Sequence, residues 1–392
     1  MSTATLQCTS CGKDFDVLAA PLLCGVCKKG LLQVRHNLGR VRERVNRYDI
    51  ARGPKSLWRY VELLPVERES ITTLGEGMTP SIKSENLGKE WGLSNLSFKL
   101  EYGNPTGSFK DRGTSVSVSV LRASGAKEVF DDSSGNAGSS LAAYCARAGI
   151  ACTIYAPSNA SEQKLAQTRV YGAKVVKVKG PRAAASRAAL RAWRAGKGSY
   201  ASHLRSPFFI EGTKTLAFEV AEEHRWDVPD HMVFPVGGGS LLLGAFKGFT
   251  ELSELNWTKG IPKLHCIQAQ TCSPIVDAYQ RGRSDVVPTH ESTTIAAGIM
   301  ITDPPRGRQV LEALKSSGGS AVAVSDGEIL EAQRLLARCE GLFAEPTSCA
   351  ALAGLKKLIE KGEISGDESV VLPLTGSGLK QVGTLRERHR RL

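Results

Sequence analysis

Short apolar runs alternate with amphipathic stretches from residue 46 onward, and this alternation most restricts the fold that the chain can adopt. The apolar runs have the length of buried strands, and the amphipathic stretches have the length of helices. We expect strands at residues 151–156, 173–178, 232–236, 264–269 and 369–374, and helices at 162–171, 183–195, 240–255, 326–339 and 348–361. Such a chain forms parallel sheets wrapped by helices, so the predicted fold class is α/β. A length of 392 residues suggests two lobes and a smaller segment.

Lys110 follows a turn rich in small residues, in the segment Asn104–Gly113, and Phe109 precedes it. A lysine held partly out of water there loses its preference for the charged form, and the neutral amine can condense with an aldehyde. Taken alone, Lys110 can equally be a surface lysine at the start of a helix. Three further segments, each at the end of an expected strand, favour the reactive lysine.

The first two of these segments place small residues between a strand and a helix. Residues 131–138, Asp-Asp-Ser-Ser-Gly-Asn-Ala-Gly, precede an Ala-rich helical run, and Asn136 can offer its amide to a ring oxygen or a carboxylate. Three glycines and Ser240 follow the strand at 232–236, where backbone N–H groups and a helix N-terminus can hold an anion. Because no nucleotide-binding fingerprint fits these glycines, a single phosphate suits them better than a nucleotide.

The third segment ends the strand at 369–374 with Thr375 and a glycine turn. A threonine hydroxyl can hydrogen-bond a neutral ring nitrogen without protonating it, although the segment taken alone is a plain turn. Together the four segments supply an amine, a partner for a ring oxygen, a phosphate cup and a partner for a ring nitrogen. These are the contacts that pyridoxal phosphate requires.

On these segments the chain resembles the pyridoxal-phosphate enzymes of the tryptophan synthase β-subunit fold type, fold type II, and among them the threonine synthases. The motifs lie in the family's order from about residue 75 to 380, and they are Gly75–Pro80, Ser108–Gly113, Glu211–Thr215 and Ala344–Ser348. The resemblance implies a small lobe at 115–205 and a large lobe at 46–114 and 206–392. It also implies a zinc-ribbon-like extension at 1–45.

The same resemblance implies a carbon–oxygen lyase of threonine biosynthesis, which converts O-phospho-L-homoserine and water to L-threonine and phosphate. Its partner is therefore a small anionic amino-acid phosphate, and a homodimer is expected. The resemblance assigns catalysis to Lys110, cofactor binding to Lys110, Asn136, Gly237, Gly238, Gly239, Ser240 and Thr375, and substrate binding to Thr79, Ser108, Ser133, Ser134 and Arg205.

Two other functions stay open. One is a β-replacement or β-elimination enzyme of the same fold, such as a cysteate synthase or a serine/threonine dehydratase. The other is a non-catalytic relative that binds the cofactor or a partner. Asp111, directly after the lysine, favours a threonine synthase, and the intact Lys110 argues against a non-catalytic protein.

The sequence departs from the family where the substrate phosphate is expected to bind. Threonine synthases commonly carry an arginine two residues after the proline of the segment before Glu211, and this chain has Phe209 there. Loss of a bidentate arginine–phosphate contact typically costs about 1.5–3 kcal/mol. Arg205, His203 and Lys214 are near enough in sequence to replace that charge.

Four of the ten cysteines form two Cys-x-x-Cys pairs, namely Cys8 with Cys11 and Cys24 with Cys27. Four thiolates at this spacing can close a tetrahedral zinc site, and so short a segment has little core without a metal. Disulfides and redox-active pairs are the alternatives. The segment resembles the zinc-ribbon-like extension of many threonine synthases, so we expect a structural zinc ion.

The formal charge of +12 is spread along the chain, and its clusters alternate with apolar residues at helical spacing. We therefore expect solvated helix faces and no nucleic-acid binding. A basic protein also attracts an anionic substrate. The sequence has neither a signal-peptide pattern nor a stretch of about 20 apolar residues that could cross a membrane, so a cytoplasmic location and no membrane partner are expected.

Overall fold

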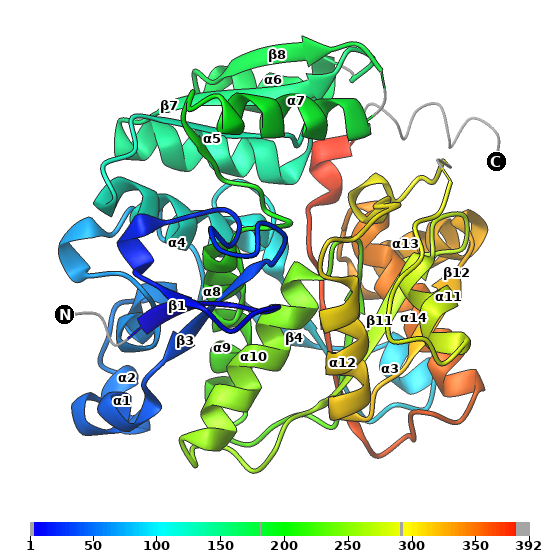
Figure 1. The fold of residues 1–392 in the computed structure, drawn as a ribbon. Coiled ribbons are helices and arrows are strands. Elements are labelled where there is room, and N and C mark those ends of the chain that lie inside the picture. Colours follow the sequence, from blue (N-terminus) through cyan, green and yellow to red (C-terminus); the bar gives the residue numbers. More distant parts are fainter. Residues whose placement is uncertain (1–3, 161, 181, 291–292, 382–392) are drawn as a thin grey trace. The chain divides into compact units, whose positions relative to one another are not determined.

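The computed structural model describes residues 4–160, 162–180, 182–290 and 293–381 of the chain (Figure 1). The chain divides into two compact units, each made of two stretches. The first unit comprises Met1–Met78 and Lys110–Leu216, and the second comprises Thr79–Phe109 and Ala217–Leu392. Mostly parallel strands that alternate with helices build the main sheet of each unit, which confirms the predicted α/β fold class.

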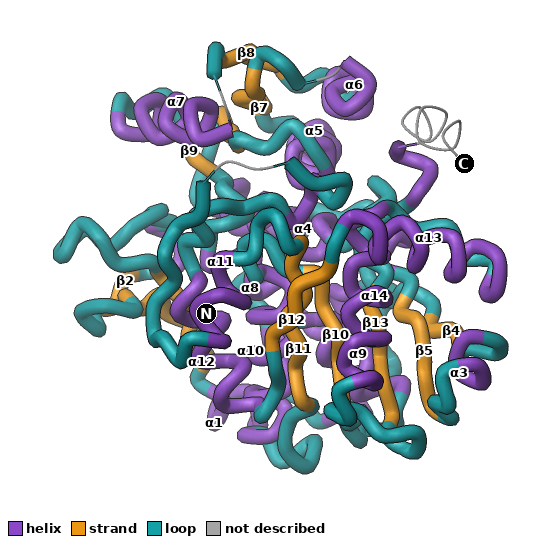
Figure 2. The backbone as a smooth tube through the Cα atoms, turned by 90° about the vertical axis from the view of Figure 1, so that its right-hand side faces the viewer, coloured by secondary structure: helices purple, strands orange, loops and turns teal. Residues whose placement is uncertain are grey.

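The second unit is built on a six-stranded sheet with the strand order β12-β11-β10-β13-β5-β4 (Figure 2). These strands are β12 (Ala321–Val324), β11 (Lys263–Ala269), β10 (His231–Pro235), β13 (Ser369–Pro373), β5 (Asn95–Lys99) and β4 (Ser81–Lys83). Neighbouring strands are parallel except for β4 and β5. The strands predicted at 232–236, 264–269 and 369–374 are therefore confirmed to within one residue at each end.

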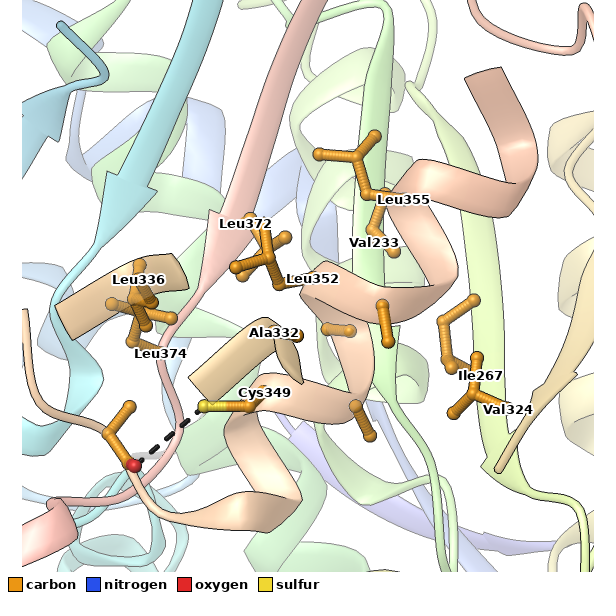
Figure 3. Close-up of a cluster of buried hydrophobic side chains, with 14 of the residues drawn as sticks. Val233, Ile267, Val324, Ala332, Leu336, Cys349, Leu352, Leu355, Leu372 and Leu374 are labelled. Carbon is orange, nitrogen blue, oxygen red and sulfur yellow. Dashed lines mark hydrogen bonds between the residues drawn. The ribbon is translucent and has the colours of Figure 1, made fainter. Parts of the chain in front are cut away.

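Helices of the second unit pack their apolar faces on this sheet. They are α3 (Leu87–Glu90), α10 (Ser240–Glu254), α11 (Pro274–Gln280), α12 (Gly307–Ser317), α13 (Asp326–Glu340) and α14 (Pro346–Glu360). Figure 3 shows Leu352 and Leu355 of α14 in one buried cluster with Val233 of β10 and Ile267 of β11. A parallel strand is covered on both faces, which explains why these strands are almost continuously apolar in sequence.

The first unit contains a four-stranded parallel sheet with the strand order β8-β7-β6-β9. Its strands are β8 (Lys174–Val178), β7 (Ala151–Pro157), β6 (Glu128–Asp131) and β9 (Ser199–Tyr200), and its helices are α4 (Lys110–Ala123), α5 (Asn136–Ala148), α6 (Glu162–Val170) and α7 (Arg182–Arg194). Because β6 and β9 are neighbours, residues that follow these two short strands lie near each other.

A three-stranded antiparallel sheet forms the start of the first unit. It consists of β1 (Ala4–Cys8), β2 (Asp14–Phe15) and β3 (Leu32–His36), with β1 in the centre. The short helices α1 (Leu38–Arg44) and α2 (Arg47–Ile50) follow it. Apolar residues of this sheet share a buried cluster with Val116 of α4 and Phe208 of α8 (Pro207–Thr213). The boundary between the units falls after Leu216, inside α9 (Thr215–Glu223).

In the part of the chain that the structure describes, no helix combines the length and the apolar character needed to cross a membrane.

Candidate active site

Lys110 is the first residue of α4, and its ammonium lies beside an aromatic ring of the same unit. The Nζ atom is 5.9 Å from the centre of the Phe209 ring on α8. Gly113 allows this arrangement, because a Cβ atom there would lie only 2.6 Å from that ring. Phe209 itself is buried. The residue at the family's arginine position thus lies next to the candidate reactive lysine.

The turn that carries Asn136 is tight. β6 ends at Asp131, and α5 begins at Asn136 after Gly135 as its N-cap residue. A Cβ atom at Gly138 would overlap the carbonyl oxygen of Ser133, so the turn requires glycine there. Ser133 is buried, and Ser134 and Asn136 are half-buried. The start of a helix is a position that favours an anion, so binding of an anionic group at this turn stays a prediction.

An acidic cluster, which the sequence analysis did not assign to the site, precedes this turn. The Nδ1–H of His203 donates to Asp131 Oδ2 over 3.0 Å, and Arg182 Nη2 lies 3.5 Å from His203 Nε2. The Tyr200 hydroxyl donates to Asp132 Oδ1 over 2.8 Å. Asp131, Asp132 and His203 are all buried, and among the described residues the Asp131 Oδ1 atom has no hydrogen-bond partner.

Burial controls the protonation of this cluster. It raises the pKa of Asp131, and it raises the pKa of Asp132 together with the neighbouring Asp131 charge. Burial also lowers the pKa of His203 well below its usual range, and the charges of Lys110 and Arg182 act in the same direction. His203 is therefore a neutral imidazole at pH 7, which hydrogen-bonds without adding positive charge.

The glycine cup of the second unit follows β10 and ends at Ser240, the first residue of α10. A Cβ atom at Gly237 would lie 2.9 Å from Ile301 Cγ1 and 3.0 Å from Ile299 Cα. Gly239 has a φ of 82°, and a Cβ atom there would overlap Val310. Both positions therefore require glycine, because this turn packs closely against Ile299, Ile301 and Val310. The cup fits the phosphate of pyridoxal phosphate.

Thr375 lies just after β13, and its hydroxyl is buried. Its Oγ1 atom lies 2.9 Å from Ser348 Oγ, which also accepts from the backbone N–H of Gly376 over 2.9 Å. Ser108 forms a β-bridge with Gly376, and its buried Oγ atom has no hydrogen-bond partner among the described residues. The hydroxyls of Thr375 and Ser108 therefore lie at one end of the sheet in this unit, where they can bond to a polar ligand.

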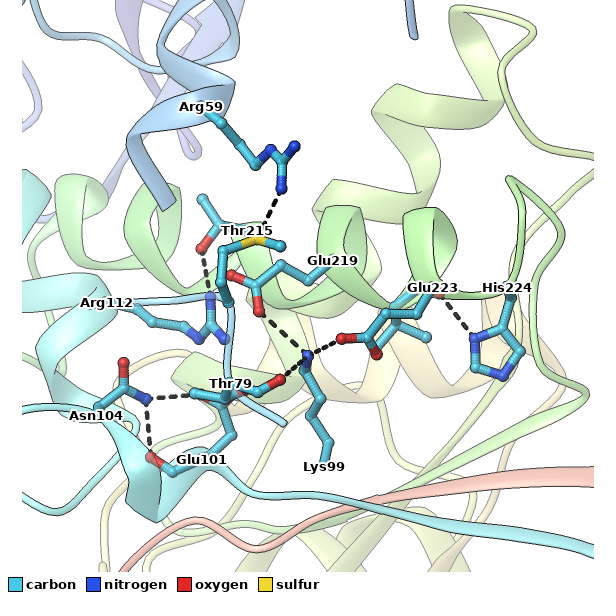
Figure 4. Close-up of polar contacts among 12 residues, drawn as sticks. Arg59, Thr79, Lys99, Glu101, Asn104, Arg112, Thr215, Glu219, Glu223 and His224 are labelled. Carbon is cyan, nitrogen blue, oxygen red and sulfur yellow. Dashed lines mark hydrogen bonds and ion pairs between the residues drawn. The ribbon is translucent and has the colours of Figure 1, made fainter. Parts of the chain in front are cut away.

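Thr79 is held in a buried polar network of the second unit (Figure 4). Its hydroxyl donates to Glu101 Oε1 over 2.7 Å, and its carbonyl oxygen accepts from Lys99 Nζ over 2.6 Å. Lys99 also pairs with Glu219, at 3.3 Å, and with Glu223. The Thr79 hydroxyl is therefore positioned by a carboxylate acceptor.

Two of the cations that the sequence offered as replacements for the family's arginine do not supply a free positive charge. Lys214 Nζ pairs with Glu211 Oε2 at 2.6 Å, and both side chains are fully buried. His203 is neutral. Arg205 is half-buried in the turn before α8, and Arg182 at the start of α7 is a second guanidinium, which sequence reasoning missed.

The four N-terminal cysteines come together at one end of β1 and β3, with their sulfur atoms within 4.8 Å of one another. The Cys8–Cys27 and Cys11–Cys24 sulfur distances are both 3.7 Å. Tetrahedral zinc with bonds of about 2.3 Å needs sulfur atoms about 3.8 Å apart, whereas a disulfide needs about 2.05 Å. The backbone N–H groups of Lys29 and Gly30 lower the pKa of Cys27 to about 6. The donor set therefore fits a zinc ion.

Comparison with known proteins identifies the family. Residues 72–376 match the model of the pyridoxal-phosphate dependent enzyme family. A threonine synthase of Methanocaldococcus jannaschii is 41% identical over 95% of this chain and 92% of its own length. A threonine synthase of Methanosarcina acetivorans is 38% identical over 97% and 93%, and one of Halalkalibacterium halodurans is 40% identical over 84% and 92%.

Solved structures support the fold. An L-serine ammonia-lyase of Rhizomucor miehei has a TM-score of 0.69 and 24% identity, with 80% of this chain and 98% of that chain covered. A threonine deaminase of Solanum lycopersicum has a TM-score of 0.70 and 21% identity, with coverage of 85% and 94%. The chain belongs to the pyridoxal-phosphate dependent enzymes and, within them, to the threonine synthase family. Its activity is that of a threonine synthase-like lyase.

Proposed function

We propose that the chain converts O-phospho-L-homoserine and water to L-threonine and phosphate. The similarity to named threonine synthases over nearly the full length of both chains carries this proposal. Pyridoxal phosphate, when bound, withdraws electrons from the substrate so that protons at its α and β carbons become acidic.

Lys110 is proposed as the residue that binds the cofactor covalently. Its free amine would remove protons at Cα and Cβ of the substrate as phosphate leaves Cγ, and it would return protons at Cγ and Cα while water adds at Cβ. The Phe209 ring, 5.9 Å from Nζ, keeps water away from one side of the amine. Partial exclusion of water favours the neutral amine that can accept a proton.

Six residues besides Lys110 are proposed as cofactor contacts. Asn136 donates to the ring oxygen, Gly237, Gly238, Gly239 and Ser240 hold the phosphate, and Thr375 contacts the ring nitrogen. The position of these glycines directly before the N-terminus of α10 supports the phosphate role. A hydroxyl at position 375 leaves the ring nitrogen largely unprotonated, which increases the importance of proton transfers by Lys110.

Thr79, Ser108, Ser133, Ser134 and Arg205 are proposed as substrate contacts. Ser133 and the start of α5 suit the α-carboxylate, because a helix N-terminus attracts an anion. We assign the substrate phosphate to Arg205, because its half-buried guanidinium lies four residues before Phe209, the position of the family's arginine.

Cys8, Cys11, Cys24 and Cys27 are proposed to bind one structural zinc ion, which leaves no ligand position open for chemistry. A homodimer, a cytoplasmic location and the assignment of residues 115–205 to a small lobe, 46–114 and 206–392 to a large lobe and 1–45 to an extension stay predictions.

The proposed function is tested with purified protein that contains the cofactor. O-phospho-L-homoserine should change its absorbance spectrum and release phosphate together with threonine, and Lys110→Ala should abolish both. Borohydride reduction should place the cofactor label on Lys110, and a label on Lys99, Lys214 or Lys380 would refute that assignment.

The position of Phe209 beside Lys110 supports a β-replacement or β-elimination enzyme as the second candidate, because the ring cannot bind a phosphate. Turnover of serine or phosphoserine by a protein that leaves phosphohomoserine unchanged would establish this second function.

A further inference from the structure

The carboxyl group of Glu211 links the N-terminal sheet to α8 inside the first unit. The Nε2–H of His36 donates to Glu211 Oε2 over 2.7 Å, and Lys214 Nζ lies 2.6 Å from the same oxygen. The side chains of Glu211 and Lys214 are fully buried, and that of His36 is 1% exposed. A carboxylate buried to this degree must have close partners, because removal of one leaves an uncompensated charge. We call His36, Glu211 and Lys214 the buried triad.

His36 is the last residue of β3, and the four cysteines lie at the opposite end of the same pair of strands. β1 and β3 pair antiparallel, so that Cys8 is opposite Leu32 and Ala4 is opposite His36. A displacement of β3 therefore changes the position of the His36 imidazole. Five residue pairs of β1 and β3 thus connect the four-cysteine segment to the buried triad.

Glu211 lies on α8, two residues after Phe209, and α8 packs closely on α4. A Cβ atom at Gly212 would overlap the backbone carbonyl of Arg112, and one at Gly113 would lie 2.6 Å from the Phe209 ring. Arg112 Nη1 also donates to Thr215 Oγ1 over 3.1 Å. Because the two helices approach this closely at both glycines, α8 cannot shift without disturbing the first turn of α4, which begins at Lys110.

We propose that His36 is a positioning residue for the reactive lysine: it holds Glu211 and α8, and thereby fixes the Phe209 ring beside Lys110. This inference rests on the proposed role of Lys110. The N-terminal segment then has a role beyond its own stability, because the last residue of β3 bonds to the helix that carries Phe209. Cofactor binding should depend on a residue that never touches the cofactor.

The test compares four proteins, each loaded with pyridoxal phosphate. His36→Leu keeps the volume and removes the donor, whereas His36→Gln places an amide N–H near the position of Nε2. Arg35→Gln, on the neighbouring exposed position of β3, is the matched control. Cofactor dissociation constants, the pH dependence of the cofactor absorbance band and melting temperatures are measured for these variants and the wild-type protein.

We expect His36→Leu to bind the cofactor about tenfold more weakly and to shift the pH midpoint of its absorbance band, as loss of a hydrogen bond to a charged group implies. His36→Gln should recover most of the affinity, and Arg35→Gln should equal the wild-type protein. If His36→Leu does not fold, His36→Asn, whose shorter amide does not reach Glu211, replaces it with the same expectation.

A lower melting temperature in His36→Leu with unchanged cofactor affinity and an unchanged absorbance band would overturn the inference, because His36 would then only stabilise the fold. Removal of metal with a chelator should weaken cofactor binding in the wild-type protein, and unchanged binding would also count against it. If phosphohomoserine is not turned over but His36→Leu still weakens cofactor binding, the inference stands and the proposed function fails.

Discussion

His203 and Asp131 share a buried hydrogen bond of 3.0 Å, although 72 residues separate them in the sequence. The bond joins the ends of two neighbouring parallel strands, β6 and β9, beside the turn that leads to Asn136. The His203 ring also meets the Phe209 ring edge-on at 6.1 Å, and Phe209 lies beside Lys110. The pair therefore belongs to the surroundings of the candidate reactive lysine.

The first prediction concerns this pair. His203→Asn and Asp131→Asn should each lower kcat/KM about tenfold, because a hydrogen bond to a charged group typically contributes about 1.5–3 kcal/mol. The double variant should be little worse than either single variant, since both remove the same bond. Additive losses, which multiply to about a hundredfold, would show that the two residues act separately.

The second prediction concerns the glycine cup. Gly239→Ala places a side chain on a backbone with a φ of 82° and against Val310, so it should weaken cofactor binding severely. Gly260→Ala is a matched control, because Gly260 has a φ of 80° and a Cβ atom added there would meet nothing within 4 Å. Backbone strain should cost both variants about 1 kcal/mol of stability, and Gly239→Ala should lose more because its Cβ atom overlaps Val310. Equal cofactor affinity in the two variants would place the phosphate elsewhere.

The third prediction concerns the metal. Carefully reduced protein should contain about one equivalent of zinc, and Cys11→Ser should lower that content and the melting temperature. The reason is that a segment with so small a core depends on the metal to fold. Cys266→Ser, at a buried cysteine of β11, is the control for loss of a thiol outside the cluster and should keep the zinc. Less than about half an equivalent in the wild-type protein would contradict the site.

The fourth prediction concerns pH and His265. The Nε2 atom of His265 lies 2.8 Å from His231 Nδ1, and its Nδ1 atom lies 2.9 Å from Ser320 Oγ. Burial, together with the charges of His231 and Lys263, lowers its pKa to about 3. The unfolded chain takes up this proton near pH 6.5, whereas the native state does so only near pH 3. Stability is therefore complete above pH 6.5 and falls as the pH is lowered towards 3.

The measurement is the free energy of unfolding by urea at pH 7 and pH 5. When the pH is lowered from 7 to 5, the free energy of unfolding should fall by about 2 kcal/mol less in His265→Asn than in the wild-type protein. The variant lacks the imidazole that binds an extra proton on unfolding. His290→Asn, at an exposed histidine, should behave like the wild-type protein. If the free energy of unfolding falls equally in the wild-type protein and in His265→Asn, then His265 does not contribute to the pH dependence of stability.

Local patterns were sufficient to predict the strands, the glycine turn between β10 and α10, and the cysteine cluster. In each of these the signal lies within a few consecutive residues, as in the three glycines after β10. The His203–Asp131 bond and the pairing of Lys214 with Glu211 were not predicted. The first depends on which strand lies next to β6, and β9 has only two residues and little hydrophobic pattern. The second depends on full burial of a lysine, which sequence rarely reveals.

The last prediction concerns the substrate phosphate. Arg205 is half-buried in the turn before α8, and its backbone N–H bonds to Ser202 O over 3.0 Å, so the turn fixes the start of its side chain. Arg205→Gln should raise the KM for phosphohomoserine about tenfold while kcat changes less than about twofold, because a guanidinium–phosphate contact persists from ground state to transition state. Inorganic phosphate should also inhibit the variant more weakly.

Arg191→Gln, at an exposed arginine of α7, is the control and should match the wild-type protein. An unchanged KM in Arg205→Gln, with a raised KM in Arg182→Gln, would move the phosphate to the guanidinium beside His203.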